Sequence, residues 1–286
     1  MKLVVNYGGL FMINKKINNI ISLSAKNLFE FLNQALYRDF EPLRVARTGW
    51  AVLFAGCNIA DELFEKTARF LIEKQYPDGG WADPEESAWA AGFISQLRRK
   101  NDPVVANAIQ WLKANRLNDG EWGKHSRDRA RIPTTALVLT LLPEAGSDED
   151  YKWIAQEWAQ DLSGSVQLSY KAGFYLLVAG HASIQGDSQL IERTIRHLLD
   201  DQNDDGGFAP WKNHPIGSDP WSTGVVLWGL SKWIDRVDPA VIERALHWLE
   251  VTQLPSGYWP YHYLDEGTSY ALIGAVFAMR AMASRK

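Results

Sequence analysis

Acidic side chains stand directly before three strongly apolar segments, where they could act as general acids. Glu85 lies in PEESAWAA, Asp219 in GSDPWSTGVV, and Asp265 and Glu266 in LDEGTSYAL. A carboxyl group that faces an apolar, aromatic-lined cavity has a raised pKa, which keeps it protonated and suits it to donate a proton. Acids at the start of a helix also complement the helix dipole without any catalytic role. These residues are therefore candidate proton donors, each with a structural alternative.

Aromatic residues are the second group of side chains that could take part in a reaction. The chain has 13 Trp, 10 Tyr and 11 Phe among its 286 residues. Aromatic faces stabilise a carbocation by about 2 kcal/mol or more when desolvated, although core packing explains most aromatic side chains without a ligand. The aromatic residues that we expect near a central cavity are Trp50, Phe54, Trp89, Phe93, Phe174, Tyr175, Trp221, Trp228, Tyr270 and Phe277.

Basic residues and one histidine supply candidate binding groups. The loop Lys124–Arg131 is the densest basic run, and Arg131 at its end could hold a diphosphate or a carboxylate. A solvated loop paired with its own aspartate is the structural alternative. His214 is a candidate second proton relay, and Arg44 and Arg47, expected just before an apolar helix, could reach the same mouth.

Composition excludes several classes of protein. The formal net charge of −4 gives no general attraction for nucleic acid or an anionic membrane. The N-terminal residues are not expected to form a signal peptide, because they lack a convincing apolar core and cleavage site, and no apolar run reaches the roughly 18 residues of a membrane span. Cys57 is the only cysteine, so no intrachain disulfide can form and a cytoplasmic location is expected.

Helical periodicity predicts six pairs of helices, one amphipathic and one apolar in each pair. The amphipathic segments are residues 24–39, 61–75, 102–116, 147–161, 187–202 and 238–253, and the apolar ones are 48–57, 87–97, 134–142, 171–181, 223–233 and 268–282. A helix that is apolar on all sides must be surrounded by protein. We therefore expect an all-α fold, an (α/α)6 barrel of about twelve helices in a single domain spanning residues 24–286. Residues 1–23 are expected to form an N-terminal arm, with Ser24 as the first helix cap.

A repeated motif, Q-x-x-x-D/S-G-x-W/F, stands between paired helices at residues 75–81, 202–208 and 253–259. A weaker copy covers residues 115–122, and a degenerate one follows Gln160. The motif resembles the QW repeat of squalene and oxidosqualene cyclases and of protein prenyltransferase β subunits. This resemblance covers most of residues 60–286 and implies the terpenoid-cyclase-like toroid. The residues expected to act as structural braces at helix ends are Gln75, Trp81, Gln202, Phe208, Gln253 and Trp259.

The resemblance also indicates where a proton donor should stand. Class II terpenoid cyclases carry it two residues before the Thr of a D-x-D-D-T or D-C-T-A-E sequence. The matching positions here are Glu85, Pro133, Trp221 and Glu266, and Asp219 matches only the first Asp of the motif. The full motif is absent, which puts cyclisation of the usual kind in doubt. Glu266 or its neighbour Asp265 is the first candidate donor, followed by Asp219 and Glu85.

Metal and cofactor sites are not expected. Prenyltransferase β subunits bind zinc through an Asp, a Cys and a His, but Cys57 lies in an apolar segment without a D-x-C pair. The chain has no P-loop, no dinucleotide-binding glycine motif and no G-x-S-x-G. The acidic DDQNDDGG segment lies in a brace position of the repeat.

Three functions remain open. The first is a terpenoid-cyclase-like enzyme that binds a hydrophobic small molecule, an apolar polyene or isoprenoid, in the barrel and cyclises it through acid-initiated carbocation chemistry. The second is a non-catalytic toroid that binds a hydrophobic ligand or a partner protein. The third is a carbohydrate-active hydrolase, because (α/α)6 barrels also host glycosidases with paired carboxylates. A fold alone does not choose between them, and the oligomeric state stays open.

Overall fold

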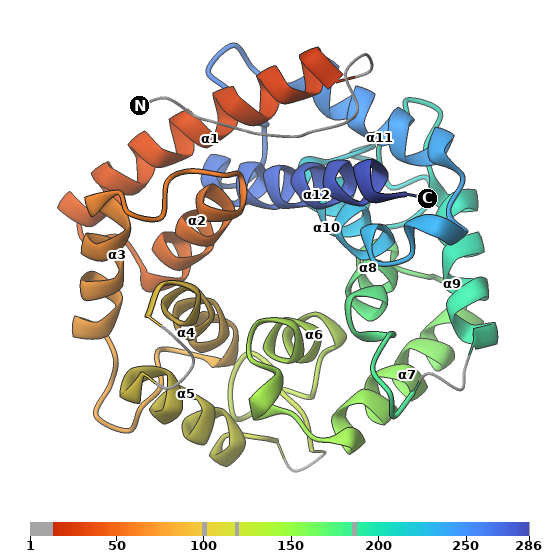
Figure 1. Ribbon diagram of the computed structural model, residues 1–286. Coiled ribbons are helices and arrows are strands. Elements are labelled where there is room, and N and C mark those ends of the chain that lie inside the picture. The colour runs from red at the N-terminus through yellow and green to blue at the C-terminus, as the bar shows by residue number, and fades with distance from the viewer. Residues whose placement is uncertain (1–13, 99–101, 118–119, 185–187, 286) are drawn as a thin grey trace.

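In the part of the chain that the structure describes, twelve α-helices form two concentric rings (Figure 1). The structure, a computed structural model, describes residues 14–98, 102–117, 120–184 and 188–285. The outer helices are α1 (Asn14–Tyr37), α3 (Glu62–Glu73), α5 (Pro103–Ala114), α7 (Asp148–Ser163), α9 (Ser188–Asp201) and α11 (Pro239–Thr252). The inner helices are α2 (Pro42–Phe54), α4 (Pro84–Arg98), α6 (Ile132–Leu141), α8 (Ser169–Val178), α10 (Pro220–Ser231) and α12 (Leu264–Ser284). The described residues contain no strand, so the expected (α/α)6 barrel is confirmed.

The inner ring closes because its helices are apolar on every side. Each inner helix packs against the next in chain order, and α12 returns to α2. Within α10 every residue except Trp221 is buried. The backbones of α10 and α12 come very close, because a Cβ atom on Gly224 would overlap the carbonyl oxygen of Tyr270 and one on Gly274 would overlap that of Gly224. Glycine therefore sets how tightly this part of the ring closes.

The first helix is longer than expected. Helix α1 begins at Asn14, so the prediction of an arm is wrong for residues 14–23, and residues 1–13 lie outside the described part. Ser24 is a buried residue within this helix, and not its cap. Its Oγ donates to the carbonyl oxygen of Gly257 at 2.7 Å and accepts from the amide of Gln253 at 2.7 Å. These bonds fix the start of the chain to its last repeat.

Several inner helices begin earlier than predicted. Helix α2 starts at Pro42 instead of residue 48, and α4, α10 and α12 start three to four residues early. Proline at the first position of a helix costs no hydrogen bond, because that N–H would be unpaired in any case. Arg44 and Arg47 consequently lie in the first two turns of α2, and not before it.

The glutamines of the repeat are braces between successive outer helices. The amide of Gln75 donates to the carbonyl oxygens of Gly79 at 2.7 Å and Val104 at 2.9 Å. Gln202 makes the same pair of bonds, to Gly206 and Val241, both at 2.8 Å. Each glutamine thus ties its own turn to the beginning of the next outer helix, which confirms the predicted structural role.

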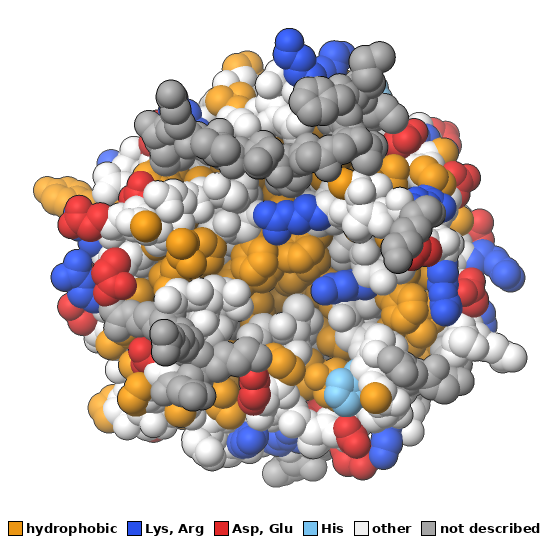
Figure 2. All heavy atoms as spheres, in the orientation of Figure 1, with side chains coloured by type: hydrophobic (Ala, Val, Ile, Leu, Met, Phe, Trp, Pro, Cys, Tyr) orange, Lys and Arg blue, Asp and Glu red, His pale blue; other side chains and the backbone are white. Residues whose placement is uncertain are grey.

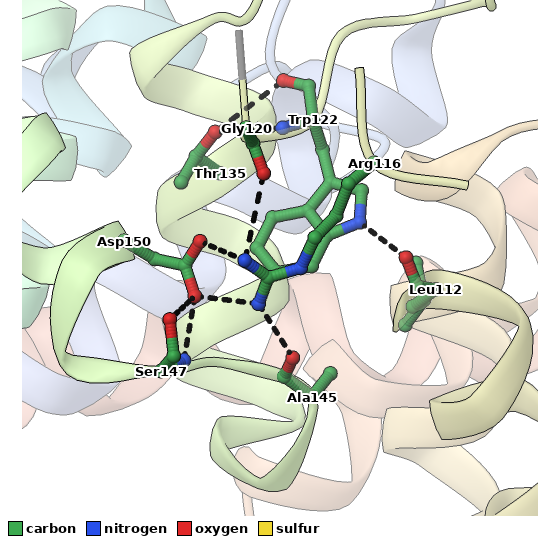
Figure 3. Close-up of polar contacts among 8 residues, drawn as sticks. All are labelled: Leu112, Arg116, Gly120, Trp122, Thr135, Ala145, Ser147 and Asp150. Atoms are coloured by element: carbon green, nitrogen blue, oxygen red, sulfur yellow. Dashed lines mark hydrogen bonds and ion pairs between the residues drawn. The ribbon is translucent and has the colours of Figure 1, made fainter. Parts of the chain in front are cut away.

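In the weaker copy an arginine replaces the glutamine (Figure 3). Arg116 lies six residues before Trp122, and its guanidinium donates to the carbonyl oxygens of Gly120 at 3.5 Å and Ala145 at 3.1 Å. It also forms two bonds of 2.6 Å with the buried carboxylate of Asp150. The copy therefore begins at Arg116, one residue later than the sequence comparison placed it.

No helix in the described part of the chain has the length and hydropathy needed to cross a membrane.

Candidate active site

A hydroxyl group in the first turn of an inner helix fixes the start of that helix in four repeats. The backbone N–H of the motif aromatic residue donates to this hydroxyl in the pairs Trp81–Ser87 (2.9 Å), Trp122–Thr135 (3.4 Å), Phe208–Thr223 (2.9 Å) and Trp259–Thr268 (3.0 Å). The position two residues before the hydroxyl is therefore equivalent in these four repeats. Glutamate occupies it in α4 and α12, as Glu85 and Glu266.

Glu85 is the less exposed member of this pair. Its side chain is 15% exposed, and the ammonium of Lys124 lies 3.7 Å from Oε2. Burial raises the pKa of Glu85, and the charges of Lys124 and Arg47 oppose this shift only in part. Burial, followed by the charge of Glu85, also raises the pKa of the Tyr270 phenol. Glu85 therefore retains its proton more strongly than an ordinary glutamate, next to a buried aromatic ring.

Asp265 and Glu266 both form ion pairs with arginine side chains. Asp265 is 1% exposed and accepts two hydrogen bonds from Arg44, one from Nε at 3.1 Å and one from Nη2 at 2.6 Å. Arg47 Nη1 donates to Glu266 Oε1 at 3.3 Å, and its Nη2 lies 3.6 Å from Asp265 Oδ2. The structure thus brings the two expected donors together with both expected arginines, in one ion-pair network.

Asp219 caps a helix. Its Oδ1 accepts the backbone N–H of Ser222 at 2.8 Å, and its Oδ2 accepts the Ser222 hydroxyl at 2.7 Å. Burial raises the pKa of Asp219, and the two bonds from Ser222 work against that shift. Its contacts are those of the structural alternative, an N-cap of α10.

Aromatic rings from four inner helices meet around Trp50. Its ring centre lies 4.0 Å from that of Phe54, 5.7 Å from Trp89, 5.5 Å from Trp228 and 5.9 Å from Phe277. We call these five residues the aromatic cluster. They come from α2, α4, α10 and α12.

A path of rings continues from the cluster toward the acids. Trp89 lies 6.0 Å from Tyr270, and Tyr270 lies 5.5 Å from Trp221. Trp221 then contacts Tyr170 at 5.1 Å and Phe174 at 6.1 Å. The expected aromatic residues of the cluster and of this path therefore contact one another inside the ring of inner helices.

Two expected lining residues lie elsewhere. Phe93 contacts Phe64 of the outer helix α3 at 6.2 Å, and it fills the space beside Gly49. Tyr175 contacts Trp158 of the outer helix α7 at 6.4 Å. Tyr175 follows Phe174 by one residue, a rotation of about 100° around the helix, so the two side chains do not face the same way. Both residues pack between the rings.

Arg131, at the end of the basic loop, and His214 show local contacts. Arg131 donates to both oxygens of Asp128, at 2.6 and 3.0 Å, on an exposed loop. The bonds from Arg131, followed by the backbone N–H of Lys124, lower the pKa of Asp128. His214 packs edge-on against Trp211 at 4.0 Å and accepts the backbone N–H of Ile216 at 3.2 Å. These two contacts match the structural alternatives, but Lys124 at the start of the same loop lies 3.7 Å from Glu85 Oε2, so the basic loop does reach the acid of α4.

No group of three or more His, Cys, Asp or Glu side chains within the described ranges is placed to hold a metal ion. Cys57 is buried, and burial raises the pKa of its thiol to about 11. A thiol in this state is a poor metal ligand.

The ring is hollowed at its centre on the face where the inner helices end (Figure 2). Apolar side chains gather in this hollow, and Lys or Arg side chains stand at its rim. Phe54 is the last residue of α2, and both it and Phe277 are only partly buried. The hollow and the acids therefore lie at opposite ends of the inner helices.

Three residues at the two ends of the inner helices were not identified from the sequence. Tyr170 contacts Trp221 near the acids, and burial, followed by the charges of Asp219 and Glu266, raises the pKa of Tyr261. Lys232 lies over the ring of Phe277 at the other end. Lys232 could have been identified from the sequence, because it is a charged residue at the end of one of the most apolar segments.

No protein-family model matches the chain. An 87-residue segment is 29% identical to labda-7,13-dienyl diphosphate synthase of Streptomyces clavuligerus, and covers 28% of this chain but only 16% of that enzyme. The structure is similar to the type II terpene cyclase MstE from Scytonema without ligand, with a TM-score of 0.72, 16% identity, and coverage of 92% of this chain and 99% of that one.

A variant of MstE in complex with geranylgeranyl dihydroxybenzoate gives a TM-score of 0.70 at 15% identity, with coverage of 93% and 99%. The unsaturated glucuronyl hydrolase of Bacillus sp. GL1 gives 0.61 at 14% identity, with coverage of 92% and 96%. At sequence identities this low, the similarity shows a shared fold. By its fold, the chain is a terpenoid-cyclase-like α/α toroid.

Proposed function

We propose that the protein is a cyclase that folds an apolar polyene or isoprenoid chain against the aromatic cluster and starts ring closure by proton transfer from Glu85. The observation that carries this proposal is the position of Glu85. It is a largely buried carboxyl group, with 15% of its side chain exposed and a raised pKa, and it lies one helical turn from Trp89, where the path of aromatic rings begins. Similarity in fold to MstE and the short match to the diphosphate synthase support the same class of chemistry.

The proposed reaction is an isomerisation. The Glu85 proton adds to a terminal alkene carbon, and the remaining carbon becomes a carbocation. The π electrons of the next alkene attack that carbon and form the new C–C bond. The last cation then loses a proton to a basic group, and its C–H electron pair forms a double bond. Glu85 regains a proton from water at the exposed edge of its carboxyl group.

Glu85 suits this step better than the acids that the sequence placed first. Asp265 is held by two bonds from Arg44, and Glu266 by Arg47. Asp219 accepts two bonds from one serine at a helix start. The Glu85 carboxylate left after proton transfer has the ammonium of Lys124 at 3.7 Å, which stabilises it as a conjugate base.

The aromatic cluster would stabilise the moving positive charge. Trp89 and Trp228 have at most 1% of their surface exposed. A ring face stabilises a desolvated cation by about 2 kcal/mol. Exclusion of water also protects a carbocation from capture as an alcohol.

A hydrolase is the second candidate, because Glu85 and Glu266 form a carboxyl pair and the glucuronyl hydrolase has the same fold. Glycosidases use such a pair at about 5 to 10 Å. The rings that follow the acids inward offer few hydrogen-bond partners for sugar hydroxyls, which favours the cyclase.

The test is incubation of the purified protein with geranylgeranyl chains, with and without a diphosphate, and with unsaturated disaccharides. Products are separated by gas or liquid chromatography with mass spectrometry. We expect cyclised isomers from the wild-type protein and at least a hundredfold less from Glu85→Gln (E85Q), given the usual contribution of about 10² to 10⁴ from general acid catalysis. The matched control is Glu149→Gln, an exposed glutamate on α7. Unchanged cyclisation by E85Q removes Glu85 from the reaction. Sugar cleavage without cyclisation establishes the hydrolase, and binding without any turnover establishes the non-catalytic toroid.

A further inference from the structure

Two of the turns that precede inner helices are much longer than the others. In four repeats such a turn runs from the motif aromatic residue to the hydroxyl residue of the next inner helix. The separation is 6 residues after Trp81 and 9 after Trp259, but 13 after Trp122 and 15 after Phe208. All four turns lie on the face where the inner helices begin, which we call the acid face. Insertions in repeat architectures gather on the face that binds a partner, so the two long turns indicate a binding surface there.

The two long turns lie on either side of the start of α8. They precede α6 and α10, and α8 packs between these two helices in the inner ring (Figure 1). The backbone N–H of Ser169, the first residue of α8, donates to the carbonyl oxygen of Pro210 in the second long turn at 2.9 Å. Burial, followed by the charge of Asp161, raises the pKa of Tyr170 in α8, and the charge of Arg131 in the first long turn opposes this shift. Both turns therefore border one surface.

The first long turn is strongly basic. Residues 124–131 contain Lys124, Arg127, Arg129 and Arg131 but only one carboxylate, that of Asp128. Arg131 is bound to Asp128, whereas Lys124, Arg127 and Arg129 are exposed. The turn also holds its own shape, because the backbone N–H of Lys124 donates to Asp128 at 3.0 Å. This part of the acid face is therefore a cationic surface that is already organised.

The second long turn exposes apolar side chains. Ile216 is 62% exposed and Trp211 is 37% exposed, and Val166 in the short turn before α8 is 58% exposed. The second turn is fixed in place, because the ammonium of Lys212 donates to two backbone carbonyl oxygens at 2.7 and 2.8 Å. Covering apolar side chains that a fixed turn holds in water is favourable. This part of the acid face therefore suits an apolar partner surface.

The separation of charge from apolar area favours a protein partner over a lipid bilayer. A bilayer presents anionic head groups above hydrocarbon at every lateral position, so a face that docks on it carries cations around its apolar tips. Here the cations lie on one long turn and the apolar side chains on the other, and Lys212 is turned back to its own chain. The formal net charge of −4 also gives no attraction to anionic lipid. A protein segment with acidic residues beside apolar ones complements both parts.

We propose that this part of the acid face docks a protein segment that carries acidic residues beside apolar ones. The docking surface comprises Lys124, Arg127, Arg129, Val166, Trp211 and Ile216. The proposal goes beyond the proposed function and does not rest on it, because docking requires neither catalysis nor the aromatic cluster. The docking surface does border the proposed donor, since Lys124 Nζ lies 3.7 Å from Glu85 Oε2.

The probes are two amphipathic helical peptides of about five turns. One has leucine on one face and glutamate on the other, and the second has glutamine in place of glutamate. Fluorescence anisotropy of the labelled peptides measures their binding to the full chain at low and at high salt. We expect the glutamate peptide to bind about tenfold or more tightly at low salt and to lose this advantage at high salt, where charges are screened. Equal affinity for the two peptides at low salt overturns the proposal.

Paired arginine variants test the cationic part of the docking surface. Arg127→Gln combined with Arg129→Gln should remove the preference for the glutamate peptide. The matched control combines Arg193→Gln with Arg196→Gln, two exposed arginines three residues apart on α9, and should keep the preference. Thermal unfolding checks that both double variants are folded. A preference that survives in the first double variant, or falls equally in both, overturns the proposal.

One isoleucine variant tests the apolar part. Ile216→Ser should weaken the binding of both peptides by about tenfold, because a largely exposed isoleucine then no longer contributes apolar area to the contact. Ile59→Ser is the matched control, since Ile59 is 53% exposed in the turn after α2, away from the acid face. Equal affinities in these two variants would show that the apolar part takes no part in docking, and would overturn the proposal.

Cross-linking and vesicles locate the contact and separate the two kinds of partner. A carbodiimide joins a glutamate of the peptide to a nearby lysine, and we expect the cross-link at Lys124. Cross-links confined to exposed lysines elsewhere, such as Lys66 or Lys113, overturn the proposal. Vesicles of phosphatidylcholine with phosphatidylserine form the second arm. Vesicle binding that depends on Ile216, without any preference for the glutamate peptide, would make the surface a membrane-docking site instead.

Discussion

Trp228 of α10 contacts Trp50 of α2 at a ring-centre distance of 5.5 Å, although helix α12 stands between these two helices in the inner ring. Helices α10 and α12 approach each other closely at Gly224 of α10 and Gly274 of α12. The aromatic cluster is therefore held by helices far apart in the sequence, and its shape depends on how closely the ring is packed.

Trp228 should matter more for the reaction than for binding. Trp228→Leu keeps an apolar side chain but removes a ring face that stabilises a cation by about 2 kcal/mol. We expect kcat for cyclisation to fall by about 30-fold, with a small change in KM. The control is Trp158→Leu, a buried tryptophan between α7 and α9 that lowers thermal stability. Equal losses of kcat in both variants would show that the effect comes from folding.

The pH dependence of activity should follow the protonation of Glu85. Burial raises the pKa of Glu85 above its ordinary value of 4.5, and the protonated form is the donor. Activity is therefore expected at low pH, and should fall about tenfold per pH unit once the pH exceeds the raised pKa.

Stability should change in the same direction. A carboxyl group with a raised pKa in the folded state binds more protons there than in the unfolded state. Its stabilising contribution is therefore complete below the unfolded pKa and is lost as pH rises through the folded one. In melting curves measured from pH 4 upward, the wild-type protein should lose stability relative to Glu85→Gln. A constant difference between the two would contradict the raised pKa.

The fold could be predicted in more detail than the site. The alternation of amphipathic and apolar segments predicted all twelve helices, because a ring of apolar helices needs a second ring around it. The start of α1 was missed, although Ile17, Ile20, Ile21 and Leu28 lie buried at helical spacing, because polar residues between them weaken the pattern. Which acid is the best candidate proton donor depends on partners that are far away in the sequence. Arg44, which pairs with Asp265, lies 221 residues before it. Spacing within one segment cannot reveal such a pair.

Gly224 should be intolerant of a side chain. A Cβ atom at this position would overlap the backbone of Tyr270 on α12, and neither helix can move without opening the inner ring. We expect Gly224→Ala to lower the free energy of unfolding by about 1–3 kcal/mol or more, as overpacking in a core does. Gly180→Ala is the control, since a Cβ there meets only one atom of Trp233, at 3.9 Å. Denaturant unfolding measures both, and equal effects would contradict the close approach.

Arg116 should resist replacement by the glutamine found in the other repeats. Arg116→Gln keeps an amide for the brace but leaves the carboxylate of Asp150, which is fully buried, without its cation. We expect a loss of about 2 kcal/mol in the free energy of unfolding. The double variant with Asp150→Asn should recover part of this loss, because no buried charge is then left unpaired. A single variant as stable as the wild type would show that the Ser147 bonds alone satisfy Asp150.

Glu266 should tune the donor without being the donor itself. The negative charge of Glu266 contributes to the raised pKa of Glu85, and the positive charge of Arg47 opposes it. Glu266→Gln removes the negative charge and frees Arg47, so the pKa of Glu85 should fall. Cyclisation should therefore persist, but its decline with rising pH should begin at lower pH than in the wild-type protein. The conservative variant Glu266→Asp keeps the charge and should restore the wild-type profile. Complete loss of product with Glu266→Gln at every pH, in a protein that still melts cooperatively, would instead make Glu266 the proton donor.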